Sequence, residues 1–101
     1  MQRCGWIGGM NNKVESFDQL ETYRAACDLD FAIFQFSRSW PKEEMYSLTD
    51  QIRRSSRSVG ANIAEAWAKR RYPAHFASKL TDADAELQET LHWLSRAKSS
   101  A

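Results

Sequence analysis

Two prolines divide the sequence into three long segments in which apolar residues recur with the period of an α-helix. Pro41 and Pro73 are the only prolines among the 101 residues, and a residue that precedes proline is pushed out of the helical region. No run of alternating β-branched residues competes with this pattern. The sequence therefore predicts an all-α fold, an antiparallel up-down bundle whose helices are joined by two short turns that contain the prolines.

The first predicted helix runs from Ser16 to about Arg38 and is apolar on two sides. We expect a capping box at its start, in which the Ser16 hydroxyl accepts from the backbone N–H of Gln19 and Gln19 reaches back. At about 100° per residue, the two apolar stripes are Phe17, Leu20, Tyr23, Cys27, Phe31 and Phe34, and Ala26, Leu29, Ile33 and Phe36. A helix that is apolar on two sides is buried on two sides, so we expect Phe31 and Phe34 to meet another subunit.

The second predicted helix runs from Pro41 to about Arg71 and combines an apolar stripe with small residues. The stripe consists of Met45, Leu48, Ile52, Val59, Ile63 and Ala66. Ser55, Ser56 and Gly60 lie among or beside these residues, where small side chains let a neighbouring helix approach closely. Because Gly costs about 1 kcal/mol relative to Ala in a helix interior, Gly60 also marks a candidate kink.

The third predicted helix begins at Tyr72-Pro73 and places a tryptophan opposite its apolar stripe. The stripe consists of Phe76, Leu80, Ala83, Leu87, Leu91 and Leu94. Trp93 falls on the opposite, acidic side. We therefore expect Trp93 either to be exposed or to be covered by another molecule, and we count it with Phe31 and Phe34 as a predicted interface residue.

The remaining parts of the chain carry no motif with a function. We expect a flexible tail over residues 1–15, the helical bundle over 16–98 and a C-terminal tail over 99–101. The N-terminus lacks the apolar segment of a secretory signal, and no apolar stretch approaches the roughly 20 residues of a spanning helix. Two cysteines cannot form a disulfide framework, so we predict free thiols at Cys4 and Cys27, a cytoplasmic protein and no membrane contact.

Positive charge is concentrated between residues 50 and 75, although the whole chain carries a net charge of only +1. The cations of this region are Arg53, Arg54, Arg57, Lys69, Arg70 and Arg71. The acids are Asp50 and Glu65, so the local net charge is +4. Guanidinium groups suit phosphate, and the six cations are the predicted binding site for RNA or DNA. The alternative is a solvated face with ion pairs inside the bundle, such as Glu65 with Lys69.

No constellation indicates a reaction or a metal. Glu89 and His92 form one Glu-x-x-His element, whereas a di-iron bundle uses two such elements and two further glutamates. The serines at 55–58 lack the Gly-x-Ser-x-Gly elbow of a nucleophile. Asn62 and Glu65 lie one turn apart, where a catalytic pair is one interpretation and a structural hydrogen-bond network the more common one. We therefore predict a non-enzymatic protein without a cofactor.

The second predicted helix carries the residues by which the chain resembles a known family. Trp40-Pro41, Gln51-Ile52-Arg53-Arg54 and Asn62-Ile63-Ala64-Glu65 resemble the four-helix-bundle proteins of the 23S rRNA intervening-sequence family, over roughly residues 16–97. That family has a fourth helix, which this sequence lacks. The resemblance implies no catalytic residues and makes Asn62 and Glu65 structural motif residues.

The resemblance also implies partners. It implies a homo-oligomer, with pentamers known for the fold. The accessory protein of diversity-generating retroelements is a similar bundle, which makes nucleic acid and a reverse transcriptase implied partners. The leading hypothesis is a helical oligomer that binds structured RNA or DNA through its second helix. The alternative is a protein–protein assembly module without nucleic-acid contact.

Overall fold

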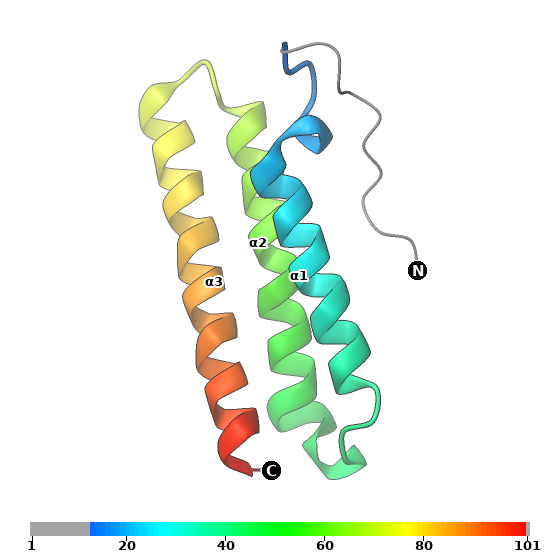
Figure 1. Ribbon diagram of the computed structural model, residues 1–101. Coiled ribbons are helices and arrows are strands. Elements are labelled where there is room, and N and C mark those ends of the chain that lie inside the picture. The colour runs from blue at the N-terminus through cyan, green and yellow to red at the C-terminus, as the bar shows by residue number, and fades with distance from the viewer. Residues whose placement is uncertain (1–12, 101) are drawn as a thin grey trace.

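The computed structural model describes residues 13–100, and within this range the chain forms three long helices and no strand (Figure 1). The long helices are α1 (Glu21–Ser37), α2 (Asp50–Ala68) and α3 (Pro73–Ser100). The short turns are the 3₁₀ turns η1 (Phe17–Gln19) and η2 (Lys42–Glu44) and the π-helical turn η3 (Met45–Thr49). The predicted all-α bundle is confirmed, and α3 continues two residues past position 98.

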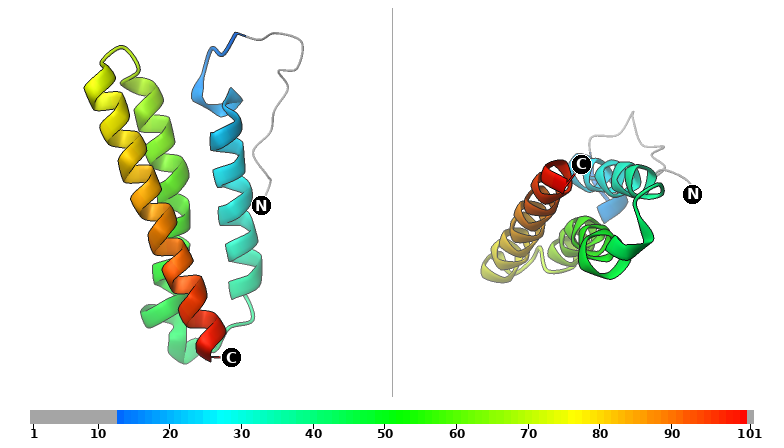
Figure 2. Two further views of the ribbon diagram at one scale, coloured as in Figure 1. Left: turned by 60° about the vertical axis from the view of Figure 1, so that its left-hand side comes forward. Right: turned by 90° about the horizontal axis from the view of Figure 1, so that it is seen from below.

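α2 is the central helix, because α1 and α3 both pack against it and scarcely touch each other (Figure 2). On the α3 side, the hydroxyl oxygens of Ser55 and Thr90 lie 2.9 Å apart and share a buried hydrogen bond. On the α1 side, Gly60 faces the ring of Tyr23 and the methyl group of Ala26. Both contacts depend on residues of α2 that have small side chains or none.

The core is built from small and β-branched residues rather than from large ones. Its central cluster consists of Ala26, Val59, Ile63 and Ala83, against which Leu20, Tyr23 and Leu87 pack. Ser55 and Ser56 are fully buried beside it. The predicted stripe of the second helix is buried apart from Met45, which is 39% exposed. Close approach of helices at the small residues is thus observed.

The predicted capping box at Ser16 is wrong. The Ser16 hydroxyl donates to the carboxylate of Asp18 instead of accepting from Gln19. The side-chain oxygen of Gln19 accepts from the backbone N–H of Glu15 at 2.7 Å. These contacts stabilise the single turn η1, and α1 begins only at Glu21.

The second helix is shorter than predicted at both ends. Its first turns are irregular, because η2 and η3 precede the regular α-helix. α2 ends at Ala68, where the backbone of Lys69 leaves the helical region with φ −103° and ψ 15°. Tyr72 precedes Pro73, which disfavours a helical conformation at position 72. The prediction that the second helix continues to about Arg71 is therefore wrong.

The prediction of a free thiol at Cys27 is also wrong. Cys27 is disulfide-bonded, and no free cysteine occurs in the part of the chain that the structure describes. Cys4 lies outside the described residues, as do most positions of the predicted N-terminal tail.

None of the helices between residues 13 and 100 is both long and apolar enough to cross a lipid bilayer.

Gly60 provides a test of the contact between α1 and α2. No break in α2 accompanies Gly60, so the candidate kink is not found. A methyl group at this position would lie 3.5 Å from Cε1 of Tyr23 and 3.7 Å from Cβ of Ala26, which is ordinary van der Waals contact. We expect Gly60→Ala to raise the free energy of unfolding by about 0.5–1 kcal/mol, and Gly60→Leu to lower it by about 1–3 kcal/mol through overpacking.

Urea unfolding followed by circular dichroism measures both effects. The matched control is Ala61→Gly at the next, exposed position, which should cost about 1 kcal/mol. Destabilisation by Gly60→Ala would contradict the spacing between the two helices.

Candidate interaction surfaces

The six predicted nucleic-acid-binding residues form two groups rather than one surface. Arg53, Arg54 and Arg57 lie on α2, whereas Lys69, Arg70 and Arg71 lie in the turn between α2 and α3. With a rise of about 1.5 Å per residue, the groups are separated by roughly 18 Å along the helix between positions 57 and 69. Each group therefore has its own surroundings.

Arg53 is a structural residue that joins α2 to α1. Its Nε donates to the hydroxyl of Ser37 at 2.7 Å. Its guanidinium group lies over the ring of Phe34, 4.9 Å from the centroid. Ser37 and Phe34 both belong to α1, and Arg53 is half-buried between the helices. These contacts occupy the guanidinium group inside the protein, which argues against a role for Arg53 in binding.

Arg54 and Arg57 are exposed, so their guanidinium groups lie at the surface. Arg54 donates to the side-chain oxygen of Gln51 at 2.9 Å. Arg57 lies at the edge of the α1 contact, 6.0 Å from the centroid of Phe34. Burial raises the pKa of Asp30 in α1, and the charge of Arg57 opposes this shift. Arg57 therefore also compensates a half-buried carboxyl group.

The turn between α2 and α3 is the most basic part of the described chain. Lys69, Arg70 and Arg71 are all exposed, and no acidic residue occurs between positions 66 and 81. Arg70 donates to the backbone carbonyl oxygen of Trp67 at 3.0 Å. Its guanidinium carbon lies 4.3 Å from the centroid of the Trp67 ring. The turn borders a shallow pocket of about 250 Å³ lined by Lys69, Tyr72 and His75.

Asn62 and Glu65, the predicted motif residues, have separate partners. The amide of Asn62 donates to the carbonyl oxygen of Ser58 at 2.9 Å, one turn back in the same helix. Glu65 pairs with Lys79 of α3 at 3.4 Å, and Lys79 also lies 3.4 Å from Asp82. Glu65 thus links α2 to α3 rather than pairing with Lys69.

Trp93 contacts both residues of the Glu-x-x-His element of α3. The indole N–H of Trp93 donates to the carboxylate of Glu89 at 3.1 Å. The ring of His92 packs edge-on against Trp93 with the centroids 4.8 Å apart. No group of three or more side chains that could hold a metal ion occurs among residues 13–100. The predicted interface residues Phe31, Phe34 and Trp93 are each half-buried in the single chain.

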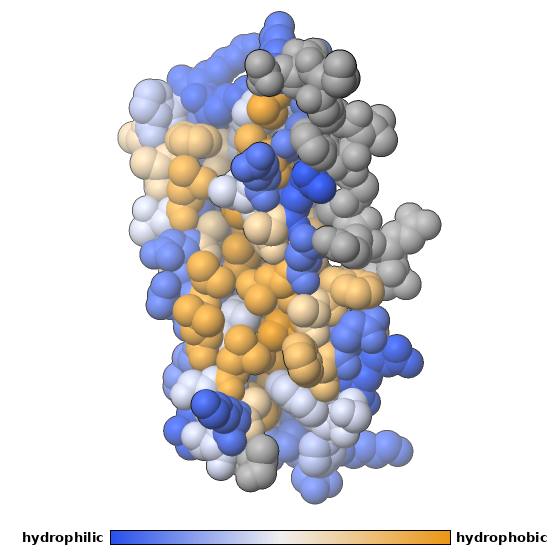
Figure 3. All heavy atoms as spheres, viewed as in Figure 1, coloured by the Kyte–Doolittle hydropathy of each residue, from blue (hydrophilic) through white to orange (hydrophobic). Residues whose placement is uncertain are grey.

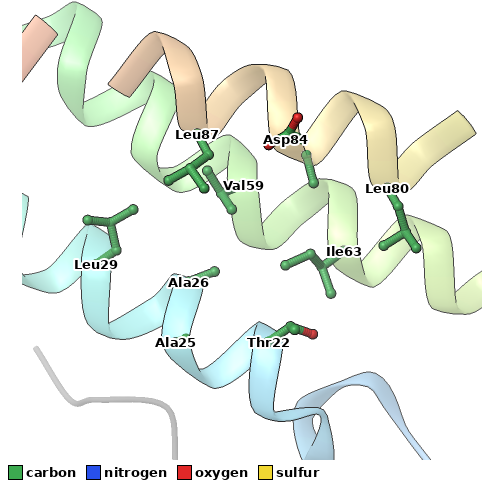
Figure 4. A pocket seen from close by; sticks show the side chains of 10 residues that line it. Thr22, Ala25, Ala26, Leu29, Val59, Ile63, Leu80, Asp84 and Leu87 are labelled. Carbon is green, nitrogen blue, oxygen red and sulfur yellow. The ribbon is translucent and has the colours of Figure 1, made fainter. Parts of the chain in front are cut away.

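An apolar groove lies between α1 and α3, with α2 as its floor (Figures 3 and 4). Its volume is about 350 Å³. Apolar side chains gather along this face over all three helices (Figure 3). The lining residues are Thr22, Ala25, Ala26 and Leu29 from α1, Val59 and Ile63 from α2, and Leu80, Ala83, Asp84 and Leu87 from α3. Asp84 is the single charged residue among them.

Exposed large apolar side chains lie both in the lining of the groove and elsewhere on α1 and α3. Leu80 is 40% exposed, Leu91 is 49% exposed and Phe36 is 70% exposed. The sequence identified the stripes to which these residues belong. It did not predict the groove, because the groove arises from the separation of α1 and α3, which helical periodicity does not encode.

The different surroundings of Arg53 and Arg54 predict different effects on stability. Arg53→Ala should lower the free energy of unfolding by about 1–3 kcal/mol, because it removes a charged hydrogen bond and a cation–π contact. Arg54→Ala, at an exposed position, should change it by less than about 0.5 kcal/mol. Urea unfolding of both variants measures the difference, and equal effects would contradict a structural role for Arg53.

The comparison with known proteins identifies the family. The chain matches the family model described as 23S rRNA-intervening sequence protein over residues 18–101. No curated protein and no solved structure matches the chain. The family match covers most of the chain, including all three helices and the motif residues of α2. The chain therefore belongs to the family of 23S rRNA-intervening sequence proteins.

Proposed function

We propose that the protein is a non-enzymatic helical module that binds structured RNA or DNA through exposed cations. The observation that carries this proposal is the turn between α2 and α3. Three consecutive cations, Lys69 to Arg71, are exposed there, and no acid occurs between residues 66 and 81 to neutralise them. Arg54 and Arg57 extend the basic surface along α2.

The proposed mechanism is electrostatic. Exposed Lys and Arg side chains neutralise phosphates and release their counterions, which gives affinity that falls with salt concentration. Contacts of this kind position a protein on nucleic acid but carry no direct sequence information. We therefore expect little base specificity. Arg53 is excluded from the proposed site, because its guanidinium group is held between Ser37 and Phe34.

Charge reversal in the turn tests this proposal. Fluorescence anisotropy with a labelled RNA hairpin and a DNA duplex gives the affinity across a salt titration. We expect Lys69→Glu combined with Arg71→Glu to weaken binding at least tenfold at low salt and to reduce the salt slope by about two, one unit per lost phosphate contact. Circular dichroism should remain unchanged, because both residues are exposed.

The matched control is the pair Arg38→Glu and Lys42→Glu, which makes the same change in net charge at exposed positions outside the turn. Equal loss of affinity in the control would show that only net charge matters. Unchanged affinity in the turn variant would contradict the proposed site.

A second candidate function is favoured by the apolar groove: self-association of the chain as an assembly module. An apolar recess with exposed leucines along it is typical of a surface that another molecule covers. The occupant we propose is a second copy of this chain, because the groove has a single charged lining residue, Asp84, and two copies can meet there with little repulsion. The pentamer and the reverse transcriptase implied by the family resemblance stay predictions.

Sedimentation equilibrium over a concentration series tests self-association. Leu80→Glu combined with Leu91→Glu should shift the protein toward monomer, because both side chains are exposed in the single chain and would place charges in the apolar contact. Tyr46→Glu, at an 84% exposed aromatic outside the groove, is the control and should leave association unchanged. A wild-type protein that is monomeric throughout would contradict this candidate function.

A further inference from the structure

We propose that Tyr72 is a stacking platform for an unpaired nucleotide, whose flanking phosphates are bound by Lys69 and Arg71. This proposal rests on the proposed binding of nucleic acid at the turn between α2 and α3. It deepens that function by naming the part of a structured RNA or DNA that the turn recognises, which is a loop or bulge rather than the paired stem.

The platform is an exposed aromatic ring in a pocket that also contains a cation. Lys69, Tyr72 and His75 line this pocket, at the end of the bundle where the chain passes from α2 to α3 (Figure 1). Tyr72 is 64% exposed. Its ring is therefore accessible to a ligand from solvent, in contrast to the ring of Tyr23, which packs against the core.

Backbone hydrogen bonds fix the position of Tyr72. Its N–H donates to the carbonyl oxygen of Lys69 at 2.9 Å, and its own carbonyl oxygen accepts from the N–H of Phe76 at 2.9 Å. Pro73 further restricts the backbone of the residue that precedes it. Lys69 and Tyr72 are thus held together across one tight turn, and a preorganised site loses little conformational entropy when it binds.

The ring of His75 supports the ring of Tyr72. The two rings meet edge-on, with their centroids 6.1 Å apart and their planes at 82°. His75 belongs to the first turn of α3, so this contact ties the Tyr72 ring to a helix. Because most of Tyr72 remains exposed despite this contact, ring surface is left on which a flat base can stack.

The cations beside the platform suit the phosphates on either side of a stacked base. Lys69 lines the pocket itself, and Arg71 directly precedes Tyr72 in the sequence. Arg70 differs from them, because its guanidinium group lies over the ring of Trp67 in α2. Proteins bind single strands by this combination, in which bases stack on aromatic rings while cations neutralise the backbone.

Base pairing decides which nucleotides can use such a platform. A base inside a duplex is stacked between its neighbours, and taking it out of the stack costs energy. An unpaired base in a loop or bulge can turn outward and stack on an aromatic side chain. Every base has a flat face, so stacking tolerates different sequences, in agreement with the low base specificity expected of phosphate contacts.

Fluorescence anisotropy at low salt compares a labelled RNA hairpin with a blunt RNA duplex of the same number of nucleotides. We expect the wild type to bind the hairpin about fivefold or more tightly than the duplex. Tyr72→Ala should remove this preference and leave the salt slope unchanged, because it removes a ring and no charge. Tyr72→Phe should keep the preference, because it keeps the ring.

A hairpin with abasic loop nucleotides keeps the phosphates of the loop and lacks its bases. The wild type should bind it about fivefold or more weakly than the intact hairpin, and Tyr72→Ala should cause no further loss. The matched control is Tyr46→Ala, at an 84% exposed tyrosine outside the turn, which should leave all affinities unchanged. A DNA hairpin of the same sequence shows whether RNA or DNA supplies the nucleotide, and a loss on Tyr72→Ala with either supports the platform.

The outcomes separate this proposal from the one on which it rests. A loss in Tyr72→Ala that is confined to intact loops supports the platform. Equal binding of hairpin and duplex, or a hairpin affinity that Tyr72→Ala leaves unchanged, overturns the platform and leaves phosphate binding at the turn standing. A wild type that binds none of these ligands at low salt overturns both. Circular dichroism confirms that each variant keeps its helices.

Discussion

The close contact of α1 and α3 with a single helix, α2, determines the rest of the structure. Ser55 and Gly60 carry almost no side chain at the points where the neighbouring helices approach. Because α1 and α3 pack against different sides of α2, they are held apart. The floor of the groove is therefore the apolar ridge of α2, with Val59 and Ile63 at its centre.

This arrangement gives the molecule two surfaces of different chemistry. One is the apolar groove between α1 and α3 (Figure 4). The other is the basic surface of the turn after α2 and of the exposed arginines along that helix. Arg53 illustrates why charge alone does not define a site. It belongs to the same cluster in the sequence as Arg54, yet it contributes to the packing of α1 against α2 through Ser37 and Phe34.

Much of the fold could be predicted from the sequence, because helical periodicity and proline positions are local properties. The three helices and the burial of the stripe of α2 follow from them. Helix ends were less accurate. The Ser16 hydroxyl bonds to Asp18 instead of a backbone amide, and the turn at Lys69 ends α2 before Arg71. Such competition between neighbouring polar groups is decided by small energy differences that a motif does not contain.

The candidate sites depend on contacts between distant residues, and these were harder to predict. The stripe leucines were identified, but the sequence does not say that α1 and α3 stay apart. Ser37 and Thr90 are buried polar residues that bond to α2, and the sequence motifs predicted neither of them as a site residue. Their signal was their place at helical spacing in otherwise apolar faces, Ser37 after Ile33 and Thr90 after Ala83 and Leu87.

The most direct test of self-association through the groove is the dependence of the urea unfolding midpoint on protein concentration. If α2 leaves an apolar groove that a second copy covers, the folded state is stabilised by association, and the midpoint rises with concentration because binding to the native state shifts the folding equilibrium. We predict such a rise between low and high micromolar protein. A midpoint that stays constant over this range would show that the three-helix chain is stable with its groove open, and would contradict self-association through the groove.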